Sequence, residues 1–314
     1  MIRREQFYFR SSDEVTKLRG MRWIPVSVPV KAVLQVCHGM CEHLERYDEF
    51  AAYLAERGFL VVMHDLIGHG KSAANEEALG VWGDYMMNSK LVSDMFKVRC
   101  MMQKEYSHVP YFVMGHSMGS LITREYIMTH KDGLAGVILM GTVDYGNLTS
   151  KAGIAFLKWI SLFHRDGMRY RSTLVHKMGL GRFDKPFENE SLRNAWLSRD
   201  VEEVKKYNHD PLCNYVYSIG VFNTVLQGML YVHDAEAMEN FPKDVPVLIL
   251  GGSADVVNAN GKTTYKLWRT YKKYGWNVRK HVYQDARHEL LHETNRQKVY
   301  ADIDKWLDRQ MPAS

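Results

Sequence analysis

The 314-residue sequence predicts an α/β protein in which a mostly parallel central sheet is flanked by helices and carries one helical insertion. Three observations lead to this fold class. Continuous apolar runs recur along the chain, helical stretches separate them, and the alternation stops once, between residues 143 and 235. Continuous apolar runs are typical of strands buried on both faces, as in a parallel sheet covered by helices. Their alternation with helices is typical of a doubly wound sheet.

The expected elements follow in a regular order. Residues 6–10 and 18–28 are expected to form an antiparallel edge, where Pro25 and Pro29 are tolerated. Buried strands are expected at residues 32–37, 59–64, 111–114, 136–140 and 245–250, and a last strand at 278–284. Helices are expected at residues 47–57, at 85–106, and as a closing helix around Val299, Ile303, Trp306 and Leu307.

The segment at residues 143–235 differs in composition from the rest of the chain. It has helical patterns, few strand signals, and many methionines and aromatic residues, including Trp159, Phe163, Tyr170, Phe183, Trp196, Tyr215, Tyr217 and Phe222. We expect a core made of residues 1–142 and 236–314, and a helical cap, residues 143–235, over the carboxyl ends of the strands. Ligands bind at that end of such sheets, so some cap side chains should line an apolar pocket.

The charge distribution argues against nucleic acid as a partner. The chain has 41 Lys and Arg against 36 Asp and Glu, and the net charge of +5 is spread rather than gathered in a basic block. No apolar stretch follows the charged first residues, and none approaches the length of a membrane span, so we expect a cytoplasmic protein.

Cysteine usage is sparse, with residues at positions 37, 41, 100 and 213, which is too few for a disulfide scaffold. The run from Cys37 to His43 contains metal-binding residue types. Cys37 ends an apolar run, however, and no second ligand pair with zinc-like spacing follows. We expect neither a metal nor another cofactor.

The pentapeptide Gly115-His116-Ser117-Met118-Gly119 is the strongest indication of chemistry. An apolar run precedes it and helical spacing follows it, so it lies where a buried strand turns into a helix. In that context the pattern predicts a nucleophile elbow, in which a tight turn strains the backbone of Ser117 and the two glycines leave room for it. The alternative is a Gly-Ser turn without chemistry.

A serine nucleophile needs a histidine base, and that histidine needs a carboxylate to orient it. In this architecture the acid and then the histidine follow the serine in the chain. Asp255 comes after an apolar strand and a glycine turn, and His288 comes after the last expected strand, so both should reach the sheet edge that carries Ser117. Asp255 could instead cap the helix near Gly261.

Other residues fit these two roles less well. Asp285 competes with Asp255 but lies within a few residues of His288. Among the competing histidines, His209 and His233 fall in the expected cap. His281 lies inside the last expected strand, and His292 lies one helical turn beyond His288.

An acyl-transfer intermediate carries an oxyanion that needs fixed hydrogen-bond donors, and losing one donor typically costs roughly 10²–10³ in kcat. One donor should be the Met118 N–H, directly after the nucleophile. The other should be the Met40 N–H, in the loop after the strand that ends at Cys37. Gly39 lets this loop approach the substrate, and His38 is expected to support the loop.

Six motifs span most of the chain: residues 38–43 with Arg46-Tyr47, then 65–72, 115–119, 208–212, 252–255 and 286–289. In this order they resemble the monoglyceride lipase and lysophospholipase branch of the α/β-hydrolase family, and the nearby serine aminopeptidases. The resemblance implies an α/β-hydrolase fold and the triad Ser117, Asp255 and His288. It also implies that Glu42 and Arg46 lie near a polar head-group pocket; a surface salt bridge explains this pair equally well.

The chain departs from the family pattern at three positions. Met40 and Cys41 stand where the family usually has a small residue and a glycine, and Ser120 replaces a frequent glycine after the elbow. The bulkier Met40 is expected to narrow the pocket at the oxyanion loop.

These residues predict a cofactor-free serine ester hydrolase. The expected substrates are monoacylglycerols, lysophospholipids or similar amphiphilic esters, with the acyl chain under the cap and transient contact between the cap and a membrane surface. An aminopeptidase is one alternative, and it would need cap carboxylates at the site, the candidates being Glu188, Glu190, Glu202 and Glu203. The other alternative is a non-catalytic hydrolase-like binding protein, although such proteins typically lack a triad member.

Overall fold

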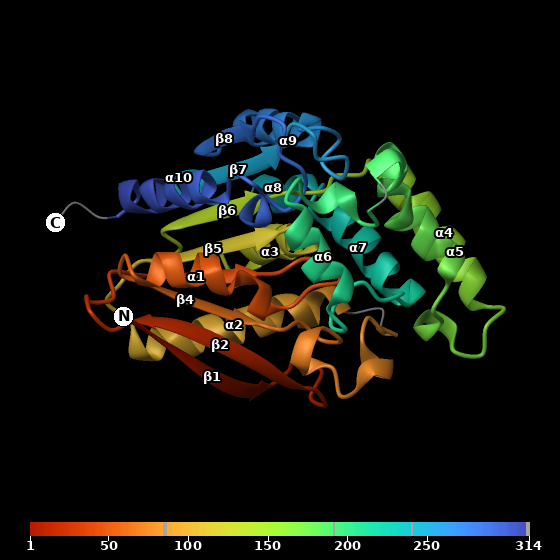
Figure 1. The fold of residues 1–314 in the computed structure, drawn as a ribbon, viewed down its shortest axis with the longest axis horizontal. Helices are drawn as coiled ribbons and strands as arrows, with labels where there is room; N and C mark the ends of the chain where they lie inside the picture. The colour runs from red at the N-terminus through yellow and green to blue at the C-terminus, as the bar shows by residue number, and fades with distance from the viewer. Residues whose placement is uncertain (84–86, 191, 240, 312–314) are drawn as a thin grey trace.

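An eight-stranded sheet forms the centre of the computed structural model, which describes residues 1–83, 87–190, 192–239 and 241–311 (Figure 1). The strands lie in the order β1-β2-β4-β3-β5-β6-β7-β8. Their bounds are Ile2–Arg10 (β1), Lys17–Pro25 (β2), Ala32–Cys37 (β3), Phe59–His64 (β4), Tyr111–His116 (β5), Gly136–Met140 (β6), Val247–Gly252 (β7) and Val278–Tyr283 (β8). The neighbours from β4 to β8 pair in parallel, whereas β2 pairs antiparallel with both β1 and β4. The predicted mostly parallel sheet is confirmed.

The parallel strands start and end within two residues of the predicted positions. The antiparallel pair differs more, because β1 begins at Ile2 and β2 ends at Pro25, three residues before the predicted end. Pro25 is thus the last residue of its strand and Pro29 lies in the loop that follows. Since β2 lies between β1 and β4, β1 alone forms this edge of the sheet.

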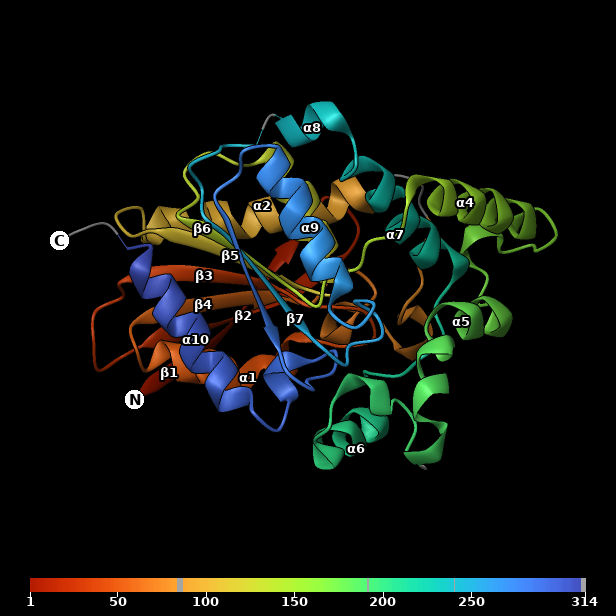
Figure 2. The same ribbon diagram turned by 90° about the horizontal axis from the view of Figure 1, so that it is seen from above.

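Helices cover both faces of the sheet (Figure 2). Helices α1 (Asp48–Ala55) and α10 (Arg296–Arg309) pack on one face, and α2 (Met87–Glu105), α3 (Met118–Thr129) and α9 (Lys262–Lys273) pack on the other. Successive side chains of a strand point to opposite faces. Accordingly Phe112 of β5 belongs to the α1–α10 side of the core, and Val113 belongs to the other side. The helix predicted at 85–106 begins at Met87 in the described chain, and Tyr85 lies outside the described residues.

Between β6 and β7 the chain forms a helical layer beside the carboxyl ends of the strands (Figures 1 and 2). Its main helices are α4 (Asn147–Ser161), α5 (Thr173–Gly179), α6 (Val201–His209) and α7 (Ile219–Tyr231), and the short α8 (Ala235–Glu239) follows. The layer has a small apolar cluster of its own, made of Leu157, Met168, Val175 and Ile219. The division into a core and a cap with boundaries at residues 143 and 235 stays a prediction, and we use the word cap for residues 143–235.

Across the described ranges, none of the helices has both the length and the apolar composition that crossing a bilayer requires.

Candidate active site

Ser117 lies at the junction of β5 and α3, in a backbone conformation that few residues adopt. Its φ is +53° and its ψ is −119°. A Cβ on Gly119 would lie 2.2 Å from the carbonyl oxygen of Cys37, and a Cβ on Gly115 would lie 2.3 Å from the carbonyl oxygen of Gly119. Both positions therefore require glycine, because α3 starts in direct contact with the neighbouring strand. The tight packing holds Ser117 in its strained turn.

The loops after β7 and β8 bring a carboxylate and an imidazole to this serine. His288 Nε2 lies 2.9 Å from Ser117 Oγ, and His288 Nδ1 lies 2.9 Å from Asp255 Oδ2. Asp255 is fully buried, and its other oxygen accepts hydrogen bonds from the Val257 and Asn258 N–H groups. With Nδ1–H donated to the carboxylate, Nε2 is the nitrogen available to the serine proton.

The competing acid and bases lie elsewhere. Asp285 is exposed and its carboxylate accepts a hydrogen bond from Gln284. The ring of His292 bonds to the carbonyl of Arg46, and those of His209 and His233 bond to Lys205 and Asp144. His281 lies within β8, with its ring against Tyr283.

The loop after β3 runs beside Ser117. A Cβ on Gly39 would lie 3.0 Å from Ser117 Cβ, which shows how closely the backbone approaches. The Gly39 N–H donates to Glu42 and the Cys41 N–H donates to Tyr217 Oη. In the described chain the N–H groups of Met40 and Met118 have no hydrogen-bond acceptor, and both residues line a cavity that contains Ser117. These are the two donors that the sequence predicts for an oxyanion, and their role stays a proposal.

His38 has a structural environment on both of its ring nitrogens. Its Nδ1 bonds to the Gly39 carbonyl, and its Nε2 accepts the Leu66 N–H. Burial is the main cause that lowers the pKa of His38 to about 3, so the ring stays neutral. The His38 side chain can therefore hold the loop, and it does not change its charge near neutral pH.

A buried ion network lies behind this loop. Arg46 makes a bidentate pair with Glu289, at 2.6 and 2.7 Å, and a single contact of 3.1 Å with Glu42. Glu42 also accepts hydrogen bonds from Tyr47 and His116, each at 3.0 Å. Only 9% of the Arg46 side chain and 2% of the Glu42 side chain are exposed, so the interpretation of this pair as a surface salt bridge is wrong.

The network keeps its groups charged although they are buried. Burial opposes ionisation of Glu42, but the hydrogen bond from His116 and the charges of His116 and Arg46 lower the pKa of Glu42 to about 2. Burial also opposes ionisation of Glu289, and Arg46 holds the pKa of Glu289 well below its usual value. The pKa of His116 is raised in spite of its burial, because Glu42 stabilises the imidazolium.

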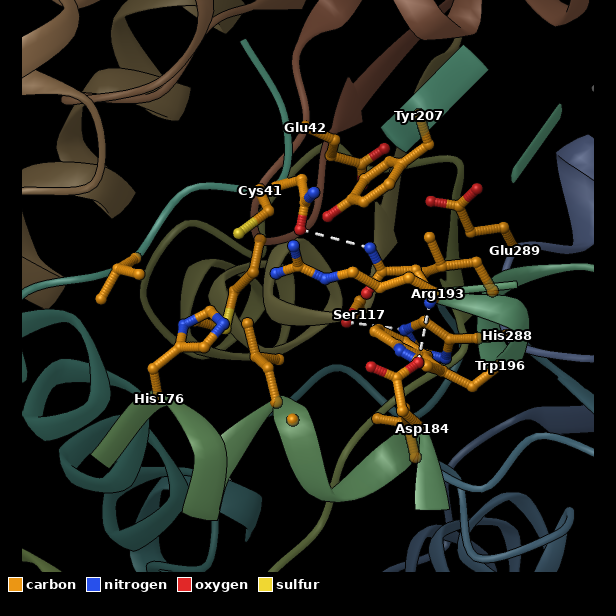
Figure 3. A pocket seen from close by; sticks show the side chains of 18 of the residues that line it. Cys41, Glu42, Ser117, His176, Asp184, Arg193, Trp196, Tyr207, His288 and Glu289 are labelled. Atoms are coloured by element: carbon orange, nitrogen blue, oxygen red, sulfur yellow. Dashed lines mark hydrogen bonds between the residues drawn. The ribbon is translucent and has the colours of Figure 1, made fainter. Parts of the chain in front are cut away.

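Two cavities meet at Ser117. The more polar of the two, about 540 Å³ and called the polar chamber below, has apolar lining residues such as Trp196 and Leu197. Its polar lining residues include Glu42, His176, Asp184, Arg193, Asn194 and Glu289. The apolar chamber, about 290 Å³, is lined mainly by Met118, Val143, Leu157, Phe183, Phe222 and Leu226. Ser117, Met40, Leu180 and Val257 line both. In Figure 3 Glu42 and Tyr207 lie above Ser117, and His176 and Asp184 lie below it. Of these four lining residues only Glu42 comes from outside the cap.

The predicted binding residues lie at different depths. Gly39 lies beside Ser117, and Glu42 lines the polar chamber together with Ser117. Arg46 lies behind that wall and is not among its described lining residues. Sequence reasoning missed Glu289 and His116 as partners of this pair, although both belong to motifs that it had singled out. The four acidic cap residues proposed for an aminopeptidase line neither chamber, and Glu190, Glu202 and Glu203 pair with Arg287, Lys205 and Lys206.

The chain is similar to known hydrolases over most of its length. Residues 28–295 match the model of the Hydrolase_4 family, described as serine aminopeptidase, S33. The chain is 28% identical to a monoglyceride lipase homolog of Monkeypox virus, over 91% of this chain and 92% of the relative. It is 29% identical to the monoglyceride lipase of Homo sapiens, covering 92% of this chain and 86% of the relative.

Solved structures share the fold. A thermostable carboxyl esterase from Bacillus coagulans, in complex with glycerol, aligns with a TM-score of 0.89 and 28% identity, over 98% of this chain and 99% of the esterase. A soluble variant of monoglyceride lipase from Saccharomyces cerevisiae, in complex with a substrate analog, aligns with a TM-score of 0.77 and 21% identity, over 98% and 96% of the two chains.

Proposed function

Because the chain belongs to the Hydrolase_4 (serine aminopeptidase, S33) family of α/β-hydrolases, we propose that it is a serine hydrolase that cleaves monoacylglycerols through an acyl-enzyme. The observation that carries this proposal is the hydrogen-bonded series Ser117–His288–Asp255 at the point where a polar and an apolar chamber meet. The monoglyceride lipases among its relatives support the same substrate class.

The geometry supports a two-step mechanism. Ser117 Oγ attacks the ester carbonyl while His288 Nε2 takes the hydroxyl proton, and Asp255 stabilises the imidazolium that forms. The N–H groups of Met40 and Met118 stabilise the oxyanion of the tetrahedral intermediate. When the intermediate collapses, His288 returns the proton to the leaving alcohol, and the acyl group stays on Ser117. Water, activated by His288, then attacks the acyl-enzyme and releases the fatty acid.

The two chambers suit the two parts of such a substrate. We place the acyl chain in the apolar chamber, where Leu157, Phe222 and Leu226 can take it out of water. The glycerol head group then faces the polar chamber, where Asn194 Nδ2 donates to Asn208 and Asn214 and leaves the Asn194 oxygen as an acceptor and the Asn214 Nδ2 as a donor for hydroxyl groups. Lysophospholipids share this division into an apolar chain and a polar head, and they stay within the proposed substrate class.

The outer face of the cap supports transient contact with a lipid surface. Large apolar side chains on and just after α4 are exposed to solvent, with 83% of Leu148, 58% of Trp159 and 81% of Leu162 accessible. Phe156 and Leu157, from the same helix, line the apolar chamber. Exposed apolar patches of this kind often mark interaction sites, and here the patch borders the proposed acyl site. The predicted cytoplasmic location stays a prediction.

Replacing the nucleophile tests the proposal. Ser117→Ala should lower kcat for monoacylglycerol hydrolysis by at least about 10⁴-fold, because removing a triad nucleophile typically removes most of the catalysis. The fatty acid released is measured by titration, and a fluorophosphonate probe should label the wild-type protein and not the variant. The melting temperature checks that the variant is folded.

The same panel separates the alternative activities. If the wild-type protein cleaves aminoacyl anilides faster than monoacylglycerols, it is an aminopeptidase. If folded wild-type protein takes no fluorophosphonate label and cleaves neither substrate, the binding-protein alternative holds. Undiminished hydrolysis by the folded Ser117→Ala variant would place the chemistry elsewhere.

A further inference from the structure

A tyrosine of the cap holds the oxyanion loop of the core. Tyr217 lies two residues before α7 and is fully buried. Its hydroxyl accepts the Cys41 N–H and lies 2.7 Å from His69 Nε2. Cys41 directly follows Met40, one of the two proposed oxyanion donors, so this contact joins the cap to the loop that supplies the donor.

The proton positions around this hydroxyl are determined by its neighbours. His69 Nδ1 lies 2.9 Å from the carbonyl oxygen of Ile67, so Nδ1 carries the proton. Burial is the main cause that lowers the pKa of His69 to about 4, and the ring is neutral near pH 7 with a bare Nε2. Tyr217 therefore donates its proton to His69 and offers its lone pairs to Cys41 N–H. Both partners of the hydroxyl are satisfied in one orientation only.

The loop has a strained point where this contact is made. Cys41 has a φ of +53°, a conformation that a residue with a side chain rarely adopts. The N–H before Met40 is held by Glu42 and the N–H after it is held by Tyr217. The Met40 N–H between them has no acceptor in the described chain. The two flanking bonds thus fix the backbone on both sides of the free donor, in a residue that lines the same cavities as Ser117.

Tyr217 is itself held in place. The Ser218 N–H donates to the carbonyl of Gly80, and the Trp82 N–H donates to the Ser218 hydroxyl, both at 2.9 Å. The Ser218 hydroxyl donates in turn to the Trp82 carbonyl. The tyrosine therefore sits on an anchored segment of the cap and not on a free loop.

We infer that Tyr217 is a positioning residue for the oxyanion hole, so that docking of this cap segment and alignment of the Met40 N–H are one event. The inference rests on the proposed function, because it assigns a purpose to the Met40 donor. The hydroxyl touches no substrate; it acts through Cys41. Losing it leaves the Cys41 N–H and His69 Nε2 buried without partners, and frees the strained loop to relax.

Tyr217→Phe removes only the hydroxyl and tests the inference. With p-nitrophenyl butyrate, we expect kcat to fall roughly 10–100-fold, less than for loss of a direct donor, with KM within twofold of wild type. A trifluoromethyl ketone forms a tetrahedral adduct with the serine and places an oxyanion in the hole, so its Ki should rise by the same factor as kcat falls. A purely structural role would lower the melting temperature of Tyr217→Phe and leave kcat and Ki of the folded variant unchanged.

Tyr215→Phe is the matched control. Tyr215 comes from the same cap segment and its ring centroid lies 5.2 Å from that of Tyr217, but its hydroxyl bonds to neither Cys41 nor His69 in the described chain. We expect kcat and Ki of this variant to stay near wild type. Should Tyr217→Phe fail to fold, His69→Ala, which removes the acceptor that orients the hydroxyl, should lower kcat and weaken the ketone in the same direction.

Two outcomes overturn the inference. Either Tyr217→Phe and His69→Ala keep wild-type kcat and Ki, or Tyr215→Phe loses as much as Tyr217→Phe. The proposed function fails separately, because it is judged by Ser117→Ala: an inactive Ser117→Ala with a fully active Tyr217→Phe rejects the positioning role alone.

Discussion

The two chambers that meet at Ser117 are built in opposite ways. The polar chamber has a wall of buried charges from the core, in which Arg46 joins Glu42 to Glu289 and Glu289 follows the proposed base in the chain. The apolar chamber is enclosed mainly by side chains from α4, α5 and α7 of the cap, with Leu157, Val175 and Leu226 among them.

This difference shows which side of the site fixes geometry and which side selects size. Charge-assisted hydrogen bonds have definite directions, so the network holds the oxyanion loop and the His288 loop in one arrangement. Apolar contacts have no direction, and volume alone decides what an apolar pocket accepts. We therefore expect changes in the polar wall to reduce stability and turnover for every ester, and changes in the apolar wall to alter the preference for acyl length.

The largest effect outside the proposed triad is expected from Glu289→Gln. The change removes the bidentate partner of buried Arg46 and leaves that charge with Glu42 alone. Breaking a buried pair from one side typically costs about 3–5 kcal/mol, because the remaining charge stays buried. Urea unfolding should show a free energy of unfolding that is lower by that amount, and kcat should fall for short and long esters alike.

The matched control is Glu190→Gln. Glu190 also makes a bidentate pair, with Arg287 at 2.9 and 2.5 Å, but 40% of its side chain is exposed. Although only 13% of the Arg287 side chain is exposed, solvent reaches the pair through Glu190 and weakens it, so the free energy of unfolding should fall by clearly less than in Glu289→Gln. Equal losses in the two variants would contradict the view that burial gives the network its importance.

Acid should act on the same wall. Glu42 has a folded-state pKa of about 2 against an ordinary value of 4.5, so its contribution to stability is present above 4.5 and is lost as the pH falls toward 2. Glu289 shifts in the same direction. The decline of wild-type stability over this range should accordingly be less steep in Glu289→Gln.

The contrast between the chambers also explains what could be predicted from the sequence. The strained Ser117 turn is a local feature with a fixed glycine pattern, and Asp255 and His288 follow from topology, because the carboxyl ends of parallel strands meet at one edge. The predicted sheet was correct for the same reason: continuous apolar runs report burial directly.

Long-range side-chain pairs could not be predicted in this way. Glu42 and Arg46 are four residues apart and read as a local pair, whereas Glu289, the stronger partner of Arg46, lies 243 positions away. Tyr217 lies 176 positions from Cys41, within a cap whose many aromatic residues look alike in sequence. Only the packing of the cap on the core distinguishes that tyrosine from its neighbours.

In the apolar chamber, Gly153→Val should change selectivity and little else. A Cβ at this position of α4 would lie 2.6 Å from Leu226 Cδ1, so added methyl groups must take space from the chamber. We expect the ratio of kcat/KM for p-nitrophenyl laurate to that for the butyrate to fall roughly tenfold or more, in line with the cost of a displaced methylene. Gly146→Val is the control, since nothing lies within 4 Å of a Cβ there. An unchanged ratio in Gly153→Val would mean that the acyl chain lies elsewhere.

The smallest effect is expected on the outer face of the cap. If the apolar surface around α4 meets lipid, Leu162→Ser should weaken sedimentation of the protein with anionic phospholipid vesicles roughly three- to tenfold, because part of one leucine is no longer buried in the bilayer. Hydrolysis of water-soluble esters should not change, since Leu162 lines neither chamber. Val15→Ser is the control, because Val15 is equally exposed, at 87%, but lies in the β1–β2 connection, outside the cap. Equal vesicle binding by the wild-type protein and both variants would reject lipid contact through the cap. The size-selecting role of the apolar chamber would remain, because that role depends only on the side chains that line the chamber.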